Sequence, residues 1–429
     1  MEILESKKIQ EKAYIETLKN GMKVIIIPKP NLDKKYIIWG THFGSIDNRF
    51  IMPKTNEEVF IPDGVAHFLE HKMFEQPNGT NSLDTLMALG LDANAYTTND
   101  HTAYLFECTD NFYEGLDELM DYVQHPYFTD QNVEKEKGII AQEIKMYDDE
   151  PSWRLYMNTM DCLYKENPIK IDIAGSVESI SEITPDVLYK CYNTFYNPSN
   201  MVMAVCGNFV PEEILEEIKK RLVEKEEQGE IKRIYPAKEK EINKTYKEAE
   251  MEVSLPMFAI GFKDTEENAD KKELVNKHIA IEILLNMIIG KSSDVFKKLY
   301  ENGTLLGQPD LDYEFSDEYA HIVISGQSKD PEQVKEQIVS EIERIKQEGL
   351  ADEHFNRIKR KIYGDYVAEY NSVGNIARMF LADTFKGINS FDYIENYDNI
   401  TKEYTKNILD RVFKEENMAM SVVKCRDLT

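Results

Sequence analysis

The chain has 429 residues, of which 42% are hydrophobic, and a formal net charge of −27 at pH 7. This length exceeds what one ordinary hydrophobic core requires, so we expect more than one domain. The acidic charge argues against a nucleic-acid partner, because phosphate binding needs a basic face. It favours cationic partners, although a solvated acidic surface is the simpler interpretation. No segment approaches the roughly 18 uncharged apolar residues that a membrane span needs, so we expect none.

The cysteines are scattered along the chain, odd in number and without CxxC spacing. This pattern predicts free thiols in a reducing cytoplasm. Residues 1–12 carry charges where a secretory signal peptide would have its apolar segment, so we expect no export by that route and a cytoplasmic location.

Strand-like and helical patterns alternate along the chain. Residues rich in β-branched and aromatic side chains predict strands at 22–28 and 36–44, joined by a turn-prone segment as in a hairpin. Residues 62–63 predict a helix N-terminus. Apolar residues at helical spacing predict helices at 111–124 and 332–346. Strands that follow strands, with helices grouped between them, predict an α+β fold with mainly antiparallel sheets.

The sharpest motif is His67-Phe68-Leu69-Glu70-His71. On a helix, residues four apart share a face, so His67 and His71 are able to bind one ion. Zinc held by two imidazoles and one carboxylate keeps a position open for water and lowers the pKa of that water to about 7. Glu70 flanks the same face and is expected to act as the general base. The alternative is a solvated helix that happens to carry two histidines.

A third ligand is expected from the acidic segment 134–151. Glu136 and Glu143 are two helical turns apart, so they project from one face with a separation of about 10 Å. A carboxylate beside bulky residues such as Ile140 and Ile144 is costly unless something binds it. We expect Glu143 to be the ligand and Glu136 to be a carboxylate that orients a ligand or tunes Glu143.

Patterns of the first half of the chain recur in the second half at an offset of 217 or 218 residues. The recurring segments are 103–106 with 321–324, 183–184 with 400–401, and 200–203 with 417–420. They predict a duplicated unit of about 200 residues, with coincidence among common apolar patterns as the alternative.

Between the two halves, residues 224–250 are dense in charge and poor in apolar side chains, which is typical of a linker. We therefore expect a zinc-bearing N-terminal α+β domain at 1–225, a linker at 226–250 and a homologous C-terminal domain without a metal at 251–429.

These motifs resemble the pitrilysin/insulinase zinc metallopeptidases, the inverzincins with an H-x-x-E-H motif. Within that family, the chain is most similar to the half-length bacterial branch related to the mitochondrial processing peptidase. The resemblance is dense in the first half, whereas the second half matches mainly in layout. The segments that carry it are 18–24, 44–47, 67–75, 90–98, 143–147, 197–201 and 205–208.

The resemblance implies one Zn²⁺ per chain, with His67, His71 and Glu143 as ligands, Glu70 as the general base and Glu136 as a supporting catalytic residue. It also implies a clam-shell of two homologous halves, and a chamber closed by four such halves from two half-length chains.

The same resemblance implies that the strand containing Asn94, Ala95, Tyr96 and Thr97 binds the substrate. An extended peptide would add to this strand as an extra strand, because the N–H and C=O groups of a sheet edge bind any backbone. An ordinary sheet strand is the alternative.

The second half departs from the family pattern. An Arg and a Tyr seven residues apart, which grip the substrate, are expected there, but Tyr300 and Gly307 occupy the equivalent positions. A misaligned loop is the alternative explanation. The departure implies a partner, namely a homologous half-length chain that supplies the Arg/Tyr pair in a heterodimer, with a homodimer as the alternative.

Two functions remain open from the sequence. The favoured one is a zinc endopeptidase that hydrolyses short flexible peptides or unfolded segments inside a chamber, through a metal-bound water activated by Glu70. The acidic net charge favours cationic peptides as its substrates. The alternative is a low-activity or non-catalytic subunit of a heterodimeric processing peptidase. The presence of His67, Glu70, His71 and Glu143 favours the first.

Overall fold

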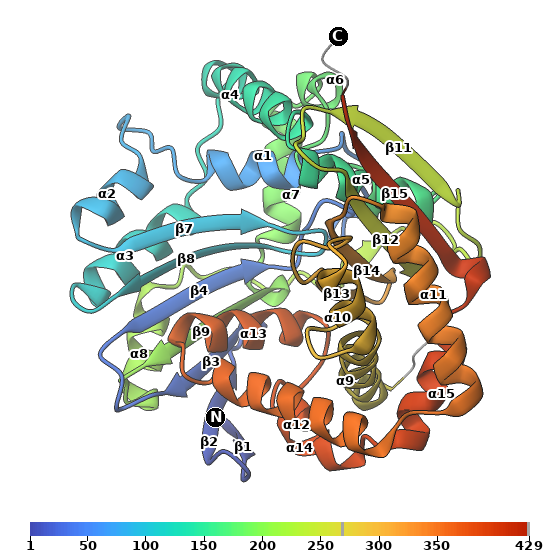
Figure 1. Cartoon of the computed structure of the whole chain (residues 1–429). Coiled ribbons are helices and arrows are strands. Elements are labelled where there is room, and N and C mark those ends of the chain that lie inside the picture. Colours follow the sequence, from blue (N-terminus) through green and yellow to red (C-terminus); the bar gives the residue numbers. More distant parts are fainter. Residues whose placement is uncertain (267–269, 427–429) are drawn as a thin grey trace. The chain divides into compact units, whose positions relative to one another are not determined.

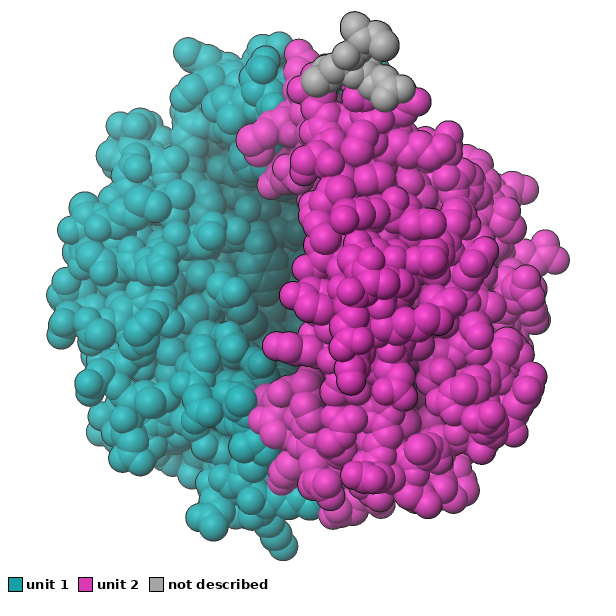
Figure 2. Space-filling view, in the orientation of Figure 1, with its two compact units in different colours: residues 1–144, 171–235, 367–391 teal, residues 145–170, 236–366, 392–429 magenta. Residues whose placement is uncertain are grey.

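The computed structural model describes residues 1–266 and 270–426 (Figure 1). The chain forms two compact units, which Figure 2 shows in different colours. Unit 1 comprises Met1–Ile144, Ile171–Tyr235 and Val367–Phe391. Unit 2 comprises Lys145–Lys170, Pro236–Tyr366 and Asp392–Thr429.

Unit 1 is built around a seven-stranded sheet in which only one pair of neighbours is parallel, β3 with β9. In spatial order its strands are β1 (Glu2–Ser6), β2 (Glu11–Thr17), β3 (Lys23–Pro28), β9 (Met201–Gly207), β4 (Lys35–Thr41), β8 (Thr102–Cys108) and β7 (Asp92–Thr97). All residues of β9 are buried, as expected for a central strand that consists almost wholly of apolar residues. β7 lies at one edge of the sheet and pairs only with β8 among the described residues.

Helices cover both faces of this sheet. The main core of unit 1 lies between one face and α1 (Val65–Lys72), α2 (Ser82–Ala88), α3 (Phe112–Gln124), α4 (Asp130–Asp148), α6 (Val177–Ser181), α7 (Pro185–Phe195) and α8 (Pro211–Arg221). The opposite face is covered by α13 (Val373–Phe385), because a Cβ added at Gly40 of β4 would meet Leu381 and Phe385 at 3.1–3.2 Å. A small sheet adds β5 (Arg49–Ile51), β6 (Glu58–Phe60) and β10 (Lys232–Arg233).

Unit 2 contains a five-stranded sheet. In spatial order its strands are β11 (Tyr246–Met251), β15 (Met418–Cys425), β12 (Met257–Lys263), β14 (Ala320–Gln327) and β13 (Asp310–Phe315). Its helices are α5 (Pro151–Leu163), α9 (Lys271–Ile288), α10 (Asp294–Glu301), α11 (Pro331–Glu348), α12 (Asp352–Glu369), α14 (Asp392–Glu395) and α15 (Lys402–Val412). Short 3-10 helices are Pro168–Lys170, Pro198–Asn200, Asn396–Asn399 and Glu415–Asn417.

The two sheets repeat one topology. The order β3-β9-β4-β8-β7 in unit 1 matches β11-β15-β12-β14-β13 in unit 2, and in both the first pair is parallel while the others are antiparallel. The side chains of Thr184 and Thr401 both cap the helix that leads to the second strand of this order. The predicted α+β class and the duplicated unit are therefore confirmed.

The two halves of the chain exchange a helix. α5 lies in the first half of the sequence but belongs to unit 2, where its Thr159 Oγ1 lies 2.7 Å from Ser421 Oγ on β15. α13 comes from the second half but belongs to unit 1. One passage between the units, at Tyr235 and Pro236, falls within the expected linker. The division into domains 1–225 and 251–429 stays a prediction, and the exchange was not foreseen.

Two local predictions were wrong. The strands at 22–28 and 36–44 exist as β3 and β4, but they do not form a hairpin, because β9 lies between them and pairs with both. The helix that carries the histidine motif begins after Gly64, which adopts φ +92°, and not at a Pro62–Asp63 cap. The predicted helices at 111–124 and 332–346 are confirmed as α3 and α11.

No helix in the described parts of the chain is long and apolar enough to cross a membrane. All five cysteines are free in the structure, as predicted, and four of them are buried.

Candidate metal centre

The histidine motif forms one buried turn of α1. Phe68 and Leu69 are fully buried in the core of unit 1, which fixes the helix on the sheet. His67 and His71 consequently lie on the other side of the helix, with their ring centroids 4.6 Å apart. A Cβ at Gly64 would come within 2.4 Å of the carbonyl oxygen of Ala174, so both this contact and the positive φ require glycine where the helix begins.

Glu143 of α4 lies opposite the two imidazoles. Its Oε1 is 3.7 Å from Nε2 of His67, and its Oε2 is 3.5 Å from Nε2 of His71. One donor atom from each of the three residues lies within 4.8 Å of the others. Two imidazole nitrogens and one carboxylate oxygen form the ligand set of a zinc site that keeps one position open. The residues therefore fit zinc.

The environment of His67 keeps its imidazole neutral. Burial, aided by the neighbouring His71, lowers the pKa of His67 to about 3. A neutral imidazole offers a lone pair to a metal, whereas a protonated one does not.

Glu136 contacts His71 and is not itself a member of the donor cluster. Its Oε1 lies 3.1 Å from Nδ1 of His71, and its Oε2 lies 3.3 Å from Nζ of Lys72. Burial by itself raises the pKa of Glu136, but the hydrogen bond with His71 and the charge of Lys72 outweigh it, so the pKa lies below its usual value. Burial likewise lowers the pKa of His71, and the bond with Glu136 and the surrounding carboxylates raise it above the usual value.

Glu70 is placed beside the donor cluster but is not one of its members. Glu70 is buried, and its Oε2 accepts a 2.6 Å hydrogen bond from Oγ1 of Thr97. Burial raises the pKa of Glu70, and the bond from Thr97 opposes that rise. A carboxylate of raised pKa is a stronger base, which suits a group that must take a proton.

The predicted substrate strand is β7, the edge strand of unit 1 (Figure 1). It pairs with β8 in an antiparallel register that places Asn94 opposite Leu105 and Thr97 opposite Thr102. Side chains alternate across a strand, so Ala95 lies on the same face as Thr97, beside α1, while Asn94 and Tyr96 lie on the other face. The outer edge of β7 has no strand partner in the described residues, and α1 packs against β7 at the side chain of Thr97.

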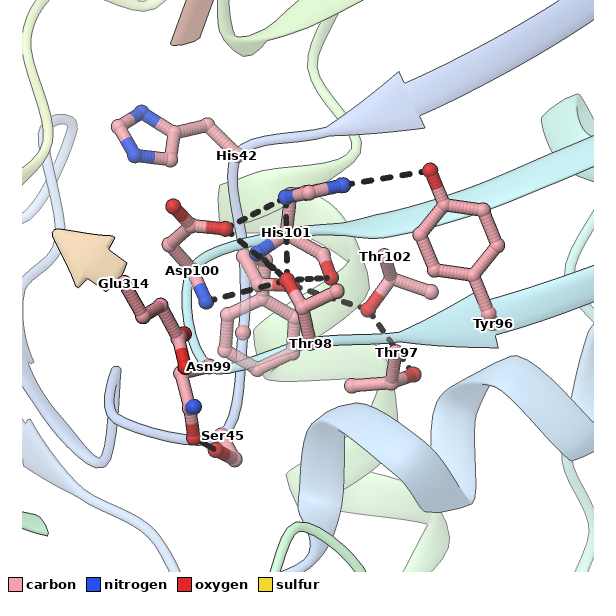
Figure 3. Close-up of polar contacts among 12 residues, drawn as sticks. His42, Ser45, Tyr96, Thr97, Thr98, Asn99, Asp100, His101, Thr102 and Glu314 are labelled. Atoms are coloured by element: carbon pink, nitrogen blue, oxygen red, sulfur yellow. Dashed lines mark hydrogen bonds and ion pairs between the residues drawn. The ribbon is translucent and has the colours of Figure 1, made fainter. Parts of the chain in front are cut away.

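A polar network closes the turn between β7 and β8 (Figure 3). Nδ1 of His101 lies 2.5 Å from Oδ1 of Asp100 and 3.0 Å from Oγ1 of Thr98, and its Nε2 lies 3.4 Å from the hydroxyl of Tyr96. Burial raises the pKa of Asp100, but its bond to His101 and nearby positive charges outweigh burial and hold the pKa well below the usual value. The network fixes the end of β7 that carries Thr97.

Sequence reasoning missed three polar residues of this region: Lys72, Asp100 and His101. Lys72 directly follows the histidine motif. The only sign in the sequence that it is buried is that the next two residues, Met73 and Phe74, are apolar. Asp100 and His101 come just after the segment 90–98 that carried the resemblance.

In unit 2, the residues at the expected Arg/Tyr positions offer no such pair. Tyr300 lies at the end of α10, is 54% exposed and stacks on Phe296 with a centroid distance of 5.5 Å. Gly307 follows in the loop before β13, and a Cβ placed there would have no neighbour within 4 Å.

Comparison with known proteins shows which protein family the chain resembles. Residues 60–176 match the family model described as insulinase (peptidase family M16), and residues 182–362 match the one described as the peptidase M16 inactive domain. The uncharacterized zinc protease YmfH of Bacillus subtilis (strain 168) is 39% identical over 427 residues, which cover 99% of this chain and 98% of that protein.

Solved structures agree with the sequence matches. A crystal structure of an M16-like peptidase from Alicyclobacillus acidocaldarius superposes with a TM-score of 0.92 at 33% identity, and covers 99% of this chain and 100% of the other. A protease from Helicobacter pylori has the same fold, with a TM-score of 0.81 at 20% identity and coverage of 96% and 99%. With relatives that match along its whole length and the ligand set of a zinc peptidase on α1 and α4, the chain belongs to the insulinase family of peptidases, M16.

Proposed function

We propose that the protein is a zinc-dependent endopeptidase that hydrolyses short flexible peptides or unfolded segments. The observation that carries this proposal is the convergence of His67, His71 and Glu143, with Glu70 beside them and outside the ligand set. A structural zinc site is closed by four protein ligands, whereas a catalytic zinc site of a hydrolase typically has three protein ligands, an open position and a neighbouring base.

His67, His71 and Glu143 would hold the zinc. When bound, the ion supplies Lewis acidity that polarises the scissile carbonyl and makes water a nucleophile near neutral pH. Glu70 accepts the proton of the attacking water and later passes it to the nitrogen of the leaving amine. Because Thr97 holds Oε2, the other carboxylate oxygen, Oε1, is the one that carries the proton.

The peptide would bind as an added strand on β7. Its backbone would pair with the outer edge of Asn94–Thr97, so recognition depends little on the peptide sequence. Binding as an added strand predicts a preference for flexible substrates, because a folded segment cannot present an extended backbone to a sheet edge.

The net charge of −27 supports a preference for cationic peptides, which should weaken as salt screens the attraction. We also retain the cytoplasm as the predicted location.

The experiment that tests the proposal compares wild type with Glu70→Gln. The amide keeps the shape of the side chain but cannot act as a base, so we expect cleavage of a basic fluorogenic peptide to fall about 10²–10⁴-fold while zinc remains bound. Zinc content by metal analysis is measured on the same samples. Cleavage within about tenfold of wild type would exclude Glu70 as the base.

A second candidate function is a low-activity or non-catalytic subunit of a heterodimeric processing peptidase. It is favoured by Tyr300 and Gly307 at the positions of the substrate-gripping pair, and by the match of residues 182–362 to an inactive domain. The two candidates differ in one measurement. A zinc-loaded chain that cleaves no peptide, either alone or with a homologous partner, would support the non-catalytic role.

A further inference from the structure

A lysine is buried directly beneath the candidate metal centre. Lys72 follows His71 in α1, and its side chain is 0% exposed. A buried ammonium group is costly unless it is paired and hydrogen-bonded. Nζ of Lys72 contacts Oε2 of Glu75 and lies 3.3 Å from Oε2 of Glu136. The expected mechanism assigns this lysine no role.

The carboxylate of Glu136 connects Lys72 to His71, which we propose as a metal ligand. Glu136 uses Oε2 toward Lys72 and Oε1 toward Nδ1 of His71, at 3.1 Å. With Nδ1 engaged, the other ring nitrogen of His71, Nε2, faces Oε2 of Glu143 at 3.5 Å. A metal-binding imidazole generally donates its second N–H to a carboxylate, which fixes the ring and its tautomer. Lys72 fixes that carboxylate in turn.

A lysine suits this task better than a neutral donor would. A protonated amine has no lone pair, so it cannot enter the ligand set itself. Its positive charge stabilises Glu136 as an anion in a pocket that also contains Glu70 and Glu143. Because Lys72 is on the same helix as His71, the ligand and the residue that orients its partner move as one rigid element.

We propose that Lys72 is a positioning residue of the metal centre, which holds the carboxylate of Glu136 against Nδ1 of His71 and thereby directs Nε2 toward the ion. The inference rests on the proposed function in taking that ion to be zinc. The competing explanation is that Lys72 only stabilises the fold through its buried ion pairs. The two differ in whether Lys72 and Glu136 act on zinc binding as one unit.

A double-mutant cycle on the full chain separates these explanations. Zinc affinity is measured by competition with a chromophoric chelator for wild type, Lys72→Met, Glu136→Gln and the double variant. We expect each single variant to bind zinc at least about tenfold more weakly, as for other partners of metal ligands. The double variant should be within about twofold of Glu136→Gln, because Lys72 acts through that carboxylate. Unchanged affinity in Lys72→Met, or losses that simply multiply in the double variant, would overturn the proposal.

Glu75→Gln is the matched control. It removes the other partner of Lys72 but leaves the Glu136–His71 contact, so zinc affinity should change by less than about twofold. A loss equal to that of Lys72→Met would show that the whole ion cluster supports the site, and would overturn the assignment to Glu136. Melting temperatures of the metal-free variants record the purely structural effect.

Three further outcomes are informative. If Lys72→Met does not fold, the cycle is run with Lys72→Gln, whose amide keeps a donor but lacks the charge, and the same expectations hold at a smaller loss. A wild-type chain that binds no zinc would refute both this inference and the proposed function. A wild-type chain that binds zinc, with no response to these variants, would refute only the role of Lys72.

Discussion

Thr97 donates a 2.6 Å hydrogen bond from Oγ1 to Oε2 of Glu70. The two residues lie on different elements, Thr97 at the end of the edge strand β7 and Glu70 on α1. The bond therefore connects the strand on which we place the substrate with the residue that we propose as the base. We therefore expect the position of β7 to affect the orientation of Glu70.

We expect Thr97→Val to reduce turnover about tenfold without loss of zinc. Valine has the shape of threonine but no hydroxyl, so the carboxylate oxygen Oε2 of Glu70 loses the hydrogen bond that Thr97 donates to it; a hydrogen bond to a charged group is typically worth about 1.5–3 kcal/mol. The measurement is kcat and KM on a fluorogenic peptide, together with zinc content. Thr102→Val is the control, since Thr102 contacts Thr97 at 3.2 Å but not Glu70. A larger fall in Thr102→Val than in Thr97→Val would refute this coupling.

The sequence predicted the positions of helices and strands well, but not which strands pair with each other. Helix α3 was expected at 111–124 and is observed at Phe112–Gln124, because five apolar residues repeat along one face and all are buried. The hairpin of β3 and β4 was wrong, since β9 begins 160 residues after the end of β4 and inserts between the two strands. A local pattern encodes that a segment is a strand, whereas its neighbour depends on segments far away in the sequence.

The same limit applies to the site. His67 and His71 were recognised because helical spacing alone places them together. Glu143 was chosen because a carboxylate beside Ile140 and Ile144 is costly unless something binds it, and because the family resemblance implies it as a ligand. Lys72 and Asp100 were missed, because a sequence does not distinguish a paired charge that is wholly or partly buried from a solvated one. Lys72 is buried against Glu136 of α4, and the half-buried Asp100 pairs with His101 in the turn between β7 and β8; both contacts exist only in the folded chain.

Glu143→Gln should weaken zinc retention, whereas its matched variant Glu136→Gln should weaken it less. The first change removes a carboxylate ligand, and the second removes only a group that contacts His71. Both variants are dialysed against a chelator, and the remaining zinc is measured over time. Full zinc in Glu143→Gln combined with loss in Glu136→Gln would mean that Glu136 is the ligand.

Asp100→Asn should destabilise the protein at neutral pH, and the difference from wild type should shrink in acid. The folded state lowers the pKa of Asp100, chiefly because its bond to His101 outweighs the effect of burial. A group with a lowered folded pKa adds stability above its unfolded pKa of roughly 3.9, and loses that contribution as the pH falls further. We expect a loss of about 1–3 kcal/mol at neutral pH, as for a buried charged hydrogen bond.

The measurement for Asp100 is urea unfolding at neutral pH and at about pH 3.5, in wild type and variant. Asp110→Asn provides the control, because this aspartate is exposed and lies just beyond the other end of β8. An Asp100→Asn effect that is equal at both pH values would show that its ionised form is not what stabilises the turn.

The remaining prediction concerns a partner chain. The residues that we propose as zinc ligands and base are all in unit 1, while Tyr300 and Gly307 stand at the positions where relatives are expected to carry the substrate-gripping pair. One positioned donor that stabilises the transition state of acyl transfer typically contributes about 10²–10³ in rate. A chain that lacks both groups should therefore cleave peptides slowly, even with zinc and Glu70 in place.

We accordingly expect the purified chain to be a weak peptidase, activated at least about 100-fold by a homologous half-length chain that has the Arg/Tyr pair and a degenerate zinc motif. Turnover is measured for each chain alone and for their mixture, and substitution of the partner's Arg should abolish the activation. Tyr300→Phe is the control within this chain, since Tyr300 is exposed and its hydroxyl is not expected to take the place of the missing pair. Full activity of the chain by itself, unchanged by any partner, would show that other groups of this chain stabilise the transition state. Loss of that activity in Tyr300→Phe would then identify Tyr300 as one of them.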